Sequence, residues 1–281
     1  MAKVAIVTDS TVCFPQELIK SYPITIAPQV LIWGNETFKD SIDIQPTAFY
    51  QRLAKASVMP SSSQASPATF EAIYRDLLSK DYQILSVLIS QKLSGTIASA
   101  VLAKSNIGED SPIEIVDSYF TAMAMGFQVL EAAKASVQGA TLAECKALVE
   151  AARMRCGIYL TVETLEFLHR GGRIGGASRF LGTALNIKPI MNVQNGAIAA
   201  LERVRTRAKS LQRLVELLET EVGKKPLQVS ALHANIPADA QYLLDQVQGR
   251  LNLTYGGISE LSPVIGANVG PGTVGLAYMT G

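Results

Sequence analysis

Three short apolar segments in the N-terminal half of the chain each end in hydroxyl-bearing or acidic residues. Val4–Val7 leads into Thr8-Asp9-Ser10-Thr11, Gln83–Ile89 leads into Ser90, and Ile113–Val116 leads into Asp117-Ser118. Helical patterns separate these segments, and that alternation is typical of a parallel sheet covered by helices. We therefore predict an α/β fold in which polar side chains gather where the strands end, the edge at which such sheets bind ligands.

Two helix starts are marked by capping residues. Ser66-Pro67 supplies an N-cap followed by proline, and five apolar side chains then share one helical face: Phe70, Ile73, Tyr74, Leu77 and Leu78. Thr141 and Glu144 form a capping box, and a stripe through Leu148 predicts a helix that runs to about Cys156 and stops at Gly157.

The length of the chain predicts two lobes. At 281 residues it exceeds the comfortable size of one hydrophobic core. We place the boundary at Gly157, with an N-terminal α/β lobe over 1–157, a C-terminal α/β lobe over 158–281 and a cleft between them.

The second half of the chain differs in its turn chemistry. Asn195-Gly196 lies between apolar segments and predicts a β-hairpin, so a mixed or antiparallel sheet is expected there. A helix is predicted from about Arg207 to Val222, a strand over Leu227–Leu232 and a short helix over Asp239–Val247.

Charge and hydropathy exclude several classes of protein. The 25 basic and 24 acidic residues give a net charge of +1, which offers no footprint for nucleic acid or an anionic membrane surface. The N-terminus lacks the features of a secretory signal, and no apolar run is long enough to span a bilayer. We expect a cytoplasmic protein that binds a small molecule or another protein.

The cysteines and histidines indicate neither disulfides nor a metal site. Cys13, Cys145 and Cys156 are widely spaced and form no C-x-x-C pair, so we expect them to be buried as small apolar residues. His169 and His233 have no further ligand at a suitable spacing, and no metal or other cofactor is predicted.

Ser94 is the central candidate binding residue. It lies where a helix starts after a strand, so free backbone N–H groups beside its hydroxyl would form an anion site that needs no lysine. Ser61-Ser62-Ser63-Gln64 is a further hydroxyl-rich loop expected at the same edge. The alternative is that Ser94 only caps its helix. No histidine lies near these serines to activate a nucleophile, so no catalytic residue is assigned.

Two glycine-rich elements remain. Gly270–Gly275 matches G-x-G-x-x-G, but six residues follow it, too few for a dinucleotide-binding unit, and we expect a tight turn near the cleft. Arg170 and Arg173 flank a glycine pair, and arginine suits phosphate and carboxylate groups. Solvated charges at a helix end are the alternative.

At these residues the chain resembles the DegV family of bacterial fatty-acid-binding proteins, the lipid-carrying subunits of fatty acid kinase. The resemblance covers nearly the whole chain and depends on the order of several short motifs: Thr8-Asp9-Ser10-Thr11, Ser61-Ser62-Ser63-Gln64, Leu93-Ser94-Gly95-Thr96, Val116-Asp117-Ser118, Arg170-Gly171-Gly172-Arg173, Lys188-Pro189-Ile190 and Gly266-Ala267 with Gly270-Pro271-Gly272.

The resemblance implies a non-enzymatic carrier that holds a long-chain fatty acid such as palmitate in an apolar tunnel. A separate kinase subunit would phosphorylate the carboxylate, and the carrier would take the acyl phosphate toward phospholipid synthesis, with transient membrane or acyltransferase contact left open. Carboxylate-binding positions fall on Ser61, Ser62, Ser94, Gly95 and Asn268. Kinase or phosphate contact is assigned by the same resemblance to two arginines, Arg170 and Arg173.

Three positions depart from the family pattern. Ser61 and Ser62 stand where threonine is usual, Ala65 stands where proline is usual, and Asn268 stands where histidine is common. Asparagine can donate a hydrogen bond but does not titrate. Two other functions stay open on the residues alone: a phosphotransferase or hydrolase that uses the same hydroxyl-rich cleft, and an interaction module whose surface is the Arg170–Arg173 loop.

Overall fold

A four-stranded parallel sheet, the N-terminal sheet, has the strand order β2-β1-β6-β7. The computed structural model describes residues 3–19, 22–182 and 187–281. The sheet comprises β1 (Lys3–Asp9), β2 (Ile24–Ala27), β6 (Tyr82–Leu88) and β7 (Ile113–Asp117). Each of the three apolar segments singled out in the sequence forms one of these strands, so the predicted parallel sheet is confirmed.

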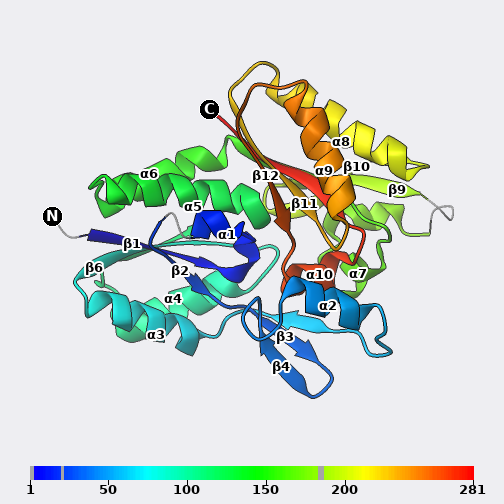
Figure 1. Ribbon diagram of the computed structural model, residues 1–281. Coiled ribbons are helices and arrows are strands. Elements are labelled where there is room, and N and C mark those ends of the chain that lie inside the picture. The colour runs from blue at the N-terminus through cyan, green and yellow to red at the C-terminus, as the bar shows by residue number, and fades with distance from the viewer. Residues whose placement is uncertain (1–2, 20–21, 183–186) are drawn as a thin grey trace.

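A small antiparallel sheet extends from the lower part of the molecule in Figure 1. It is built from β3 (Val30–Trp33), β4 (Glu36–Lys39) and β5 (Ser61–Ser63). The expectation that Ser61–Ser63 is a loop is wrong, because Leu31 pairs with Ser62 and Val30 with Ser63. A run of serines has no apolar alternation, so the pairing with β3 alone makes it a strand.

The C-terminal sheet is six-stranded and mixed, in the order β10-β9-β8-β13-β11-β12. Only β11 and β12 pair in parallel. Its strands are β8 (Cys156–Thr161), β9 (Lys188–Gln194), β10 (Ala197–Val204), β11 (Leu227–His233), β12 (Leu253–Glu260) and β13 (Val274–Thr280). The predicted hairpin is confirmed: Asn195 and Gly196 join β9 to β10 with φ of 49° and 83°.

The helices form layers around the two large sheets (Figure 1). The outer face of the N-terminal sheet packs against α3 (Pro67–Leu78) and α4 (Thr96–Ile107), and α6 (Leu142–Arg153) lies on its other side. The outer face of the C-terminal sheet packs against α8 (Arg207–Val222) and α9 (Pro237–Gln248). Among the described helices, none is both long enough and apolar enough to cross a membrane.

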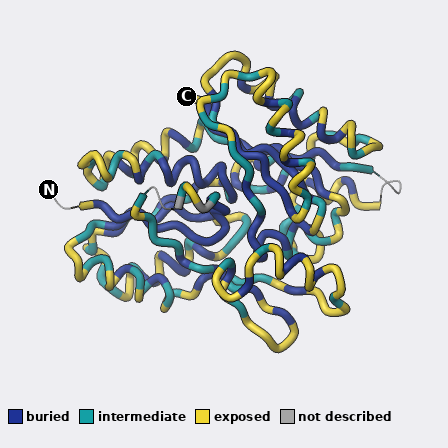
Figure 2. The backbone as a smooth tube through the Cα atoms, in the orientation of Figure 1, coloured by how far each residue is buried: buried dark blue, intermediate teal, exposed yellow. Residues whose placement is uncertain are grey.

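Helix α5 (Ala122–Val137) lies between the two large sheets and contacts β1, β8, β11 and β13. Its sequence is apolar almost all round, which is typical of a helix covered on every side. Figure 2 shows the strands on both sides of α5 as buried backbone. The largest core cluster therefore joins the N-terminal and C-terminal sheets.

Short elements complete the chain at the junction of the sheets. They are η1 (Ser10–Val12), α1 (Gln16–Ile19), α2 (Pro46–Leu53), α7 (Glu166–Arg170), η2 (Gly175–Phe180) and α10 (Pro263–Val269). Helix α10 contacts α2, α7, β3 and β5, so the C-terminal part of the chain reaches back to the small sheet.

The boundary predicted for the helix that starts at Thr141 is wrong at its C-terminal end. The capping box is confirmed, but α6 ends at Arg153, and Gly157 belongs to β8. Gly157 pairs with Tyr278, whose ring occupies the space of a Cβ, so the glycine serves strand packing and not helix termination. Leu148 is 41% exposed, and the buried face of α6 is formed instead by Cys145, Val149 and Ala152.

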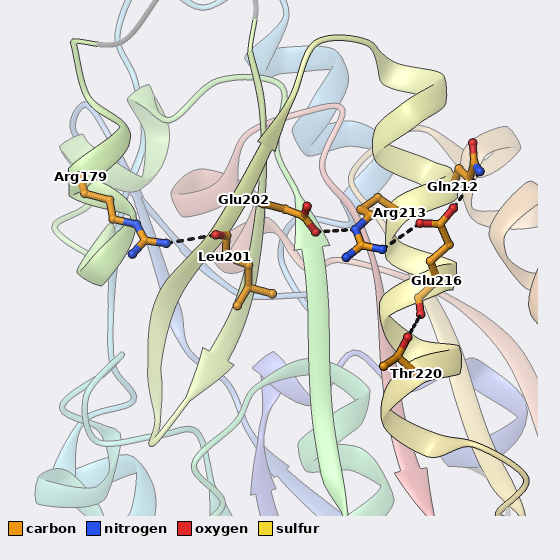
Figure 3. A network of polar contacts seen from close by, with 7 residues as sticks. All are labelled: Arg179, Leu201, Glu202, Gln212, Arg213, Glu216 and Thr220. Carbon is orange, nitrogen blue, oxygen red and sulfur yellow. Dashed lines mark hydrogen bonds and ion pairs between the residues drawn. The ribbon is translucent and has the colours of Figure 1, made fainter.

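Ion pairs join α8 to the edge of the C-terminal sheet (Figure 3). Arg213 Nε lies 2.6 Å from Glu202 Oε1 on β10, and its NH1 atom lies 2.8 Å from Glu216 Oε2 on α8. On the other side of β10, Arg179 of η2 donates to the Leu201 carbonyl at 3.2 Å. These side chains are more than a third exposed or lie at the surface, so their stabilising effect is small.

Candidate functional site

A cavity lies where the carboxyl ends of β1 and β6 meet α10 and the β9–β10 hairpin. Its empty volume is about 590 Å³, the open mouth included. Most of the wall is apolar, and one part carries hydroxyl, amide and guanidinium groups. The apolar lining consists of Ile89, Leu93, Leu168, Ile198, Val264, Ile265 and Val269. The polar lining consists of Thr11, Gln29, Ser62, Ser63, Gln64, Ser94, Thr121, Arg173 and Asn268.

Ser94 lies on this wall in the turn between β6 and α4. Helix α4 begins at Thr96 with Gly95 as its N-cap, and no side chain caps it. Ser94 Oγ instead lies 2.8 Å from Thr96 Oγ1. The alternative that Ser94 only caps its helix is therefore wrong, and its hydroxyl is available at the cavity surface.

Ser62 and Asn268 meet across the junction of the small sheet and α10. Asn268 Nδ2 donates to Ser62 Oγ at 2.9 Å and to the Val264 carbonyl at 2.9 Å. These two bonds use both amide hydrogens and hold the side chain against the cavity wall. Gly171 lies so close that a Cβ there would overlap Asn268 Oδ1, which explains glycine at this position.

Arg173 brings positive charge to the same wall. Its Nε donates to the Leu93 carbonyl at 3.0 Å, and its NH1 donates to the Gly171 carbonyl. The side chain is partly buried and bridges the loop after α7 to the turn that carries Ser94. A guanidinium fixed in this way places a positive charge next to the hydroxyl groups, and such a group is suited to carboxylates and phosphates.

A second hollow, the outer hollow, adjoins the cavity and has an empty volume of about 610 Å³. It shares Ser62, Arg173 and Asn268 with the cavity and is also lined by Ser61 and Arg170. These three shared residues form the partition between the two spaces. Arg170 is exposed, pairs with Glu166 at 2.8 Å and lies over the Phe167 ring at 5.4 Å.

The structure places some of the residues named from the sequence at the cavity and others elsewhere. Ser62, Ser94, Arg173 and Asn268 line the cavity, whereas Ser61 and Arg170 line only the outer hollow. Gly95 lines neither. Its Cα faces the Gln64 side chain, and a Cβ added to Gly95 would lie 3.1 Å from Gln64 Nε2.

Two other predicted contributors lie away from the cavity. Asp117 accepts hydrogen bonds from the backbone of Gln91 and Tyr119, and the buried Ser118 hydroxyl is used within its own turn. The Gly270–Gly272 turn is confirmed as a tight turn, with φ of 79° and 77° at its two glycines. It packs against Phe167 and Glu163, so it does not line the cavity as expected.

Sequence reasoning missed Gln29, which belongs to the polar lining of the cavity and is buried at 1% exposure. Gln29 Nε2 donates to Thr96 Oγ1 at 2.8 Å, and its Oε1 accepts from the Ala65 backbone N–H at 2.9 Å. It follows a proline between two short strands, a context that gives no local signal of a functional role.

Asp9 lies behind the same wall and belongs to the Thr8–Thr11 motif. Its carboxylate accepts from Ile89 N at 2.8 Å and from Thr11 N at 3.0 Å. Complete burial raises the pKa of Asp9, while these backbone hydrogen bonds and the Gln29 side chain oppose the rise. The motif is visible in the sequence, but the structural role of Asp9 in tying β1 to β6 is not.

Asp40 is a further buried carboxylate that the sequence did not indicate. Its Oδ2 accepts from Ser10 Oγ at 2.6 Å, and its Oδ1 accepts from Val264 N in the first turn of α10 at 3.1 Å. Burial raises the pKa of Asp40 to about 6. Asp40 thereby fixes the helix that carries Asn268.

The two histidines of the chain lie away from the polar wall. His169 is exposed on α7, and His233 is buried on β11, where desolvation lowers its pKa. Neither lines the cavity or the outer hollow. Within residues 3–19, 22–182 and 187–281, no group of three or more His, Cys, Asp or Glu side chains is arranged to hold a metal ion.

The match to known proteins extends over this whole arrangement. A family model described as "Uncharacterised protein, DegV family" matches residues 3–281. The chain belongs to the DegV family. A DegV domain-containing protein of Clostridium perfringens is 35% identical over 279 residues, which cover 98% of each chain.

Solved structures of DegV proteins share the fold. A DegV family protein from Thermus thermophilus, described as fatty acid binding, superposes with a TM-score of 0.93 at 32% identity and 99% coverage of each chain. DegV of Bacillus subtilis, described as a fatty acid binding protein, gives a TM-score of 0.88 at 29% identity and complete coverage of both chains. The α/β fold with a parallel and a mixed sheet is therefore the DegV fold.

Proposed function

We propose that this protein binds a long-chain fatty acid in the cavity between the two large sheets. The supporting observation is a largely apolar cavity wall that also carries Ser62, Ser94, Asn268 and Arg173, with Asn268 bonded to Ser62 and Arg173 bonded to the Leu93 carbonyl next to Ser94. The solved DegV proteins described as fatty acid binding support the same ligand class.

The energetics favour such a ligand. Burial of about fourteen methylenes at about 0.8 kcal/mol each gives about 11 kcal/mol of gross driving force, before the costs of association are subtracted. The contacts to the head group then need only to compensate for the water that the carboxylate loses on binding. Hydroxyl donors with one guanidinium stabilise the carboxylate form against burial.

The test is a ligand census. The protein is purified from a bacterial host under native conditions, extracted under denaturing conditions and examined by mass spectrometry. We expect about one fatty acid per chain. Repeated absence of lipid from folded protein, together with no uptake of added fatty acid, would contradict the proposal.

Ser94→Ala provides the residue-level test. Loss of a hydrogen bond to a charged group costs about 1.5–3 kcal/mol, so affinity for the acid should fall by a factor of about ten or more. Ser105→Ala is the matched control, because Ser105 is exposed on the same helix, α4. Ser105→Ala should unfold at the wild-type temperature, and Ser94→Ala should still fold but unfold at a slightly lower temperature, because the buried Thr96 hydroxyl loses a hydrogen-bond partner.

We further propose that the bound carboxylate is presented to a separate fatty acid kinase subunit and that the acyl phosphate stays on this carrier. The outer hollow supports this, because Arg170 lines it and because the hollow is separated from the cavity by residues that line both spaces. With kinase subunit, ATP and fatty acid supplied, Arg170→Ala should lower the rate of acyl phosphate formation but leave acid binding unchanged. Arg75→Ala removes a similar exposed ion pair, with Glu71 on α3, and is the control.

The division into lobes over 1–157 and 158–281 and a cytoplasmic site of action are also part of this proposal. All strands of the N-terminal sheet precede β8, and all strands of the C-terminal sheet lie from β8 onward. A kinase that uses ATP works in the cytoplasm, where both components would meet. Limited proteolysis at the exposed turn before β8, where Met154 is 84% exposed, would support the division if it released two folded fragments, and one cooperative unit without such fragments would argue against it.

A further inference from the structure

Behind Ser94 runs a short chain of hydrogen bonds whose direction is set by groups that can only donate or only accept. It passes through Gln29 and Thr96, which come from segments 67 residues apart in the sequence. Gln29 and Thr96 can influence ligand binding without touching the ligand, because they set the direction in which each hydroxyl hydrogen of this hydrogen-bond chain points.

The direction starts at the Ala65 backbone N–H, which can only donate. It donates to Gln29 Oε1 at 2.9 Å and so fixes which end of the Gln29 amide carries oxygen. The other end of the amide, Gln29 Nε2, therefore faces Thr96 as a donor, at 2.8 Å from Thr96 Oγ1.

Thr96 Oγ1 therefore accepts from Gln29 and has one hydrogen left to place. Thr96 is 0% exposed, so a hydroxyl hydrogen without an acceptor would carry a desolvation cost. Within the described residues, Ser94 Oγ, at 2.8 Å, is the remaining hydrogen-bond partner of Thr96 Oγ1. Thr96 must donate to Ser94.

Ser94 Oγ accepts that hydrogen and keeps its own O–H free at the cavity wall. We infer that Gln29 and Thr96 are positioning residues that fix the Ser94 hydroxyl as a donor toward the cavity and so make the site selective for an anionic head group. This inference rests on the proposed binding of a fatty acid.

The readout is head-group selectivity, which a merely structural role would leave unchanged. Affinities for hexadecanoic acid and for hexadecan-1-ol are measured on delipidated full-length protein by displacement of a fluorescent fatty-acid probe. The measurement is made at a pH where the acid is ionised. The ratio of the two affinities reports how well Ser94 donates, because the alcohol can itself donate to a lone pair of Ser94.

Thr96→Val removes the hydroxyl that orients Ser94 at nearly constant volume. We expect the acid-to-alcohol affinity ratio to fall about fivefold or more, because the Ser94 hydrogen is no longer held toward the ligand. Thr96→Ser retains the hydroxyl and should retain the ratio.

Gln29→Glu should reverse the direction of the chain. Its second carboxylate oxygen would accept from Thr96, so Ser94 would donate to Thr96 and present lone pairs to the cavity. We expect affinity for the acid to fall about tenfold or more and affinity for the alcohol to be kept or increased. Gln64→Glu adds the same charge at the cavity wall without contact to Thr96, so it should weaken the acid alone and leave the alcohol unchanged.

The outcomes separate the inference from the proposed function. Folded Thr96→Val protein with the wild-type ratio would overturn the inference, whether or not Gln29→Glu folds, as judged by circular dichroism and thermal unfolding. Failure of wild-type protein to bind hexadecanoic acid would overturn the proposed function instead. A ratio that falls in Thr96→Val and is retained in Thr96→Ser supports both.

Discussion

Two regions of the site interact with negative charge in different ways: the cavity wall around Ser62 and Ser94, called the inner wall, and the loop around Arg170 at the outer hollow, called the rim. On the inner wall, Ser62 and Ser94 are neutral hydroxyl groups held by neighbouring side chains: Ser62 Oγ accepts from Asn268, and Ser94 Oγ lies 2.8 Å from the buried Thr96 Oγ1. At the rim, Arg170 is a full charge, exposed and paired with its helix neighbour Glu166. Fixed neutral donors suit a ligand that stays bound, and an exposed arginine suits a contact that forms and breaks.

Arg173 connects these two regions. It lines both the cavity and the outer hollow, and its hydrogen bonds to the Leu93 and Gly171 carbonyls hold the rim loop against the turn that carries Ser94. The difference between the regions therefore depends on a few close contacts, and each can be altered separately.

The largest effect is expected from Gly171→Ala. The new methyl group would overlap Asn268 Oδ1, and Asn268 can turn away only by giving up its bond to Ser62. We expect the protein to fold and its affinity for the acid to drop about tenfold.

The neighbouring glycine provides the contrast. Gly172 has φ of 72° and open space where a Cβ would stand, so Gly172→Ala should cost about 1 kcal/mol of folding free energy without loss of affinity. Isothermal titration and chemical denaturation of both variants distinguish the two results. Equal affinities in Gly171→Ala and Gly172→Ala would show that the Asn268–Ser62 bond does not hold the ligand.

The pH dependence of stability tests the buried side of the comparison. Because the pKa of Asp40 is raised to about 6 from 3.8, the folded state holds a proton that the unfolded state has released between these values. The free energy of unfolding should therefore rise as pH falls from 7 to 5, by about 1 kcal/mol from this group.

Asp9, whose pKa is also raised, adds to the same trend, and Cys13 nearby has its pKa raised to about 12 and stays neutral over this range. Asp40→Asn should remove the Asp40 contribution. Urea denaturation at both pH values checks the difference, and an identical pH trend in wild type and Asp40→Asn would assign it to other groups.

A change in ionic strength should affect ligand binding at the inner wall less than kinase contact at the rim, and this difference should be smaller than the effects above. Affinity for the fatty acid should change less than about twofold between about 0.05 M and about 0.5 M salt, because the hydroxyl donors that hold it are uncharged and partly buried. The rate of acyl phosphate formation with a kinase subunit should fall over the same range, since exposed Arg170 is screened. A strong salt dependence of acid binding would indicate that the head group binds at the rim and not at the inner wall.

The smallest effect is expected from Glu202→Ala in the network of Figure 3. The Glu202 and Arg213 side chains are each 37% exposed, and exposed ion pairs contribute about 0.5 kcal/mol or less. Thermal unfolding should shift little, and fatty acid affinity should stay at the wild-type value. A large loss of affinity would mean that the edge of the C-terminal sheet is coupled to the cavity.

The amino-acid sequence determined the local elements of this protein. The apolar segments, the cap at Ser66, the capping box at Thr141 and the Asn195-Gly196 turn each specify a strand, helix or hairpin from neighbouring residues, and all four are present. The DegV motifs also placed Ser62, Ser94 and Asn268 among the candidates, and these residues do line one cavity.

Only the tertiary structure decided how distant residues work together. Asn268 meets Ser62 across 206 positions, Gln29 meets Thr96 across 67, and Ser61–Ser63 is a strand because β3 pairs with it. Local patterns report the preferences of a few neighbouring residues, whereas these contacts exist because packing of both sheets around α5 brings separate segments together. The direction of the hydrogen bonds behind Ser94 depends on that packing, and no stretch of sequence contains it.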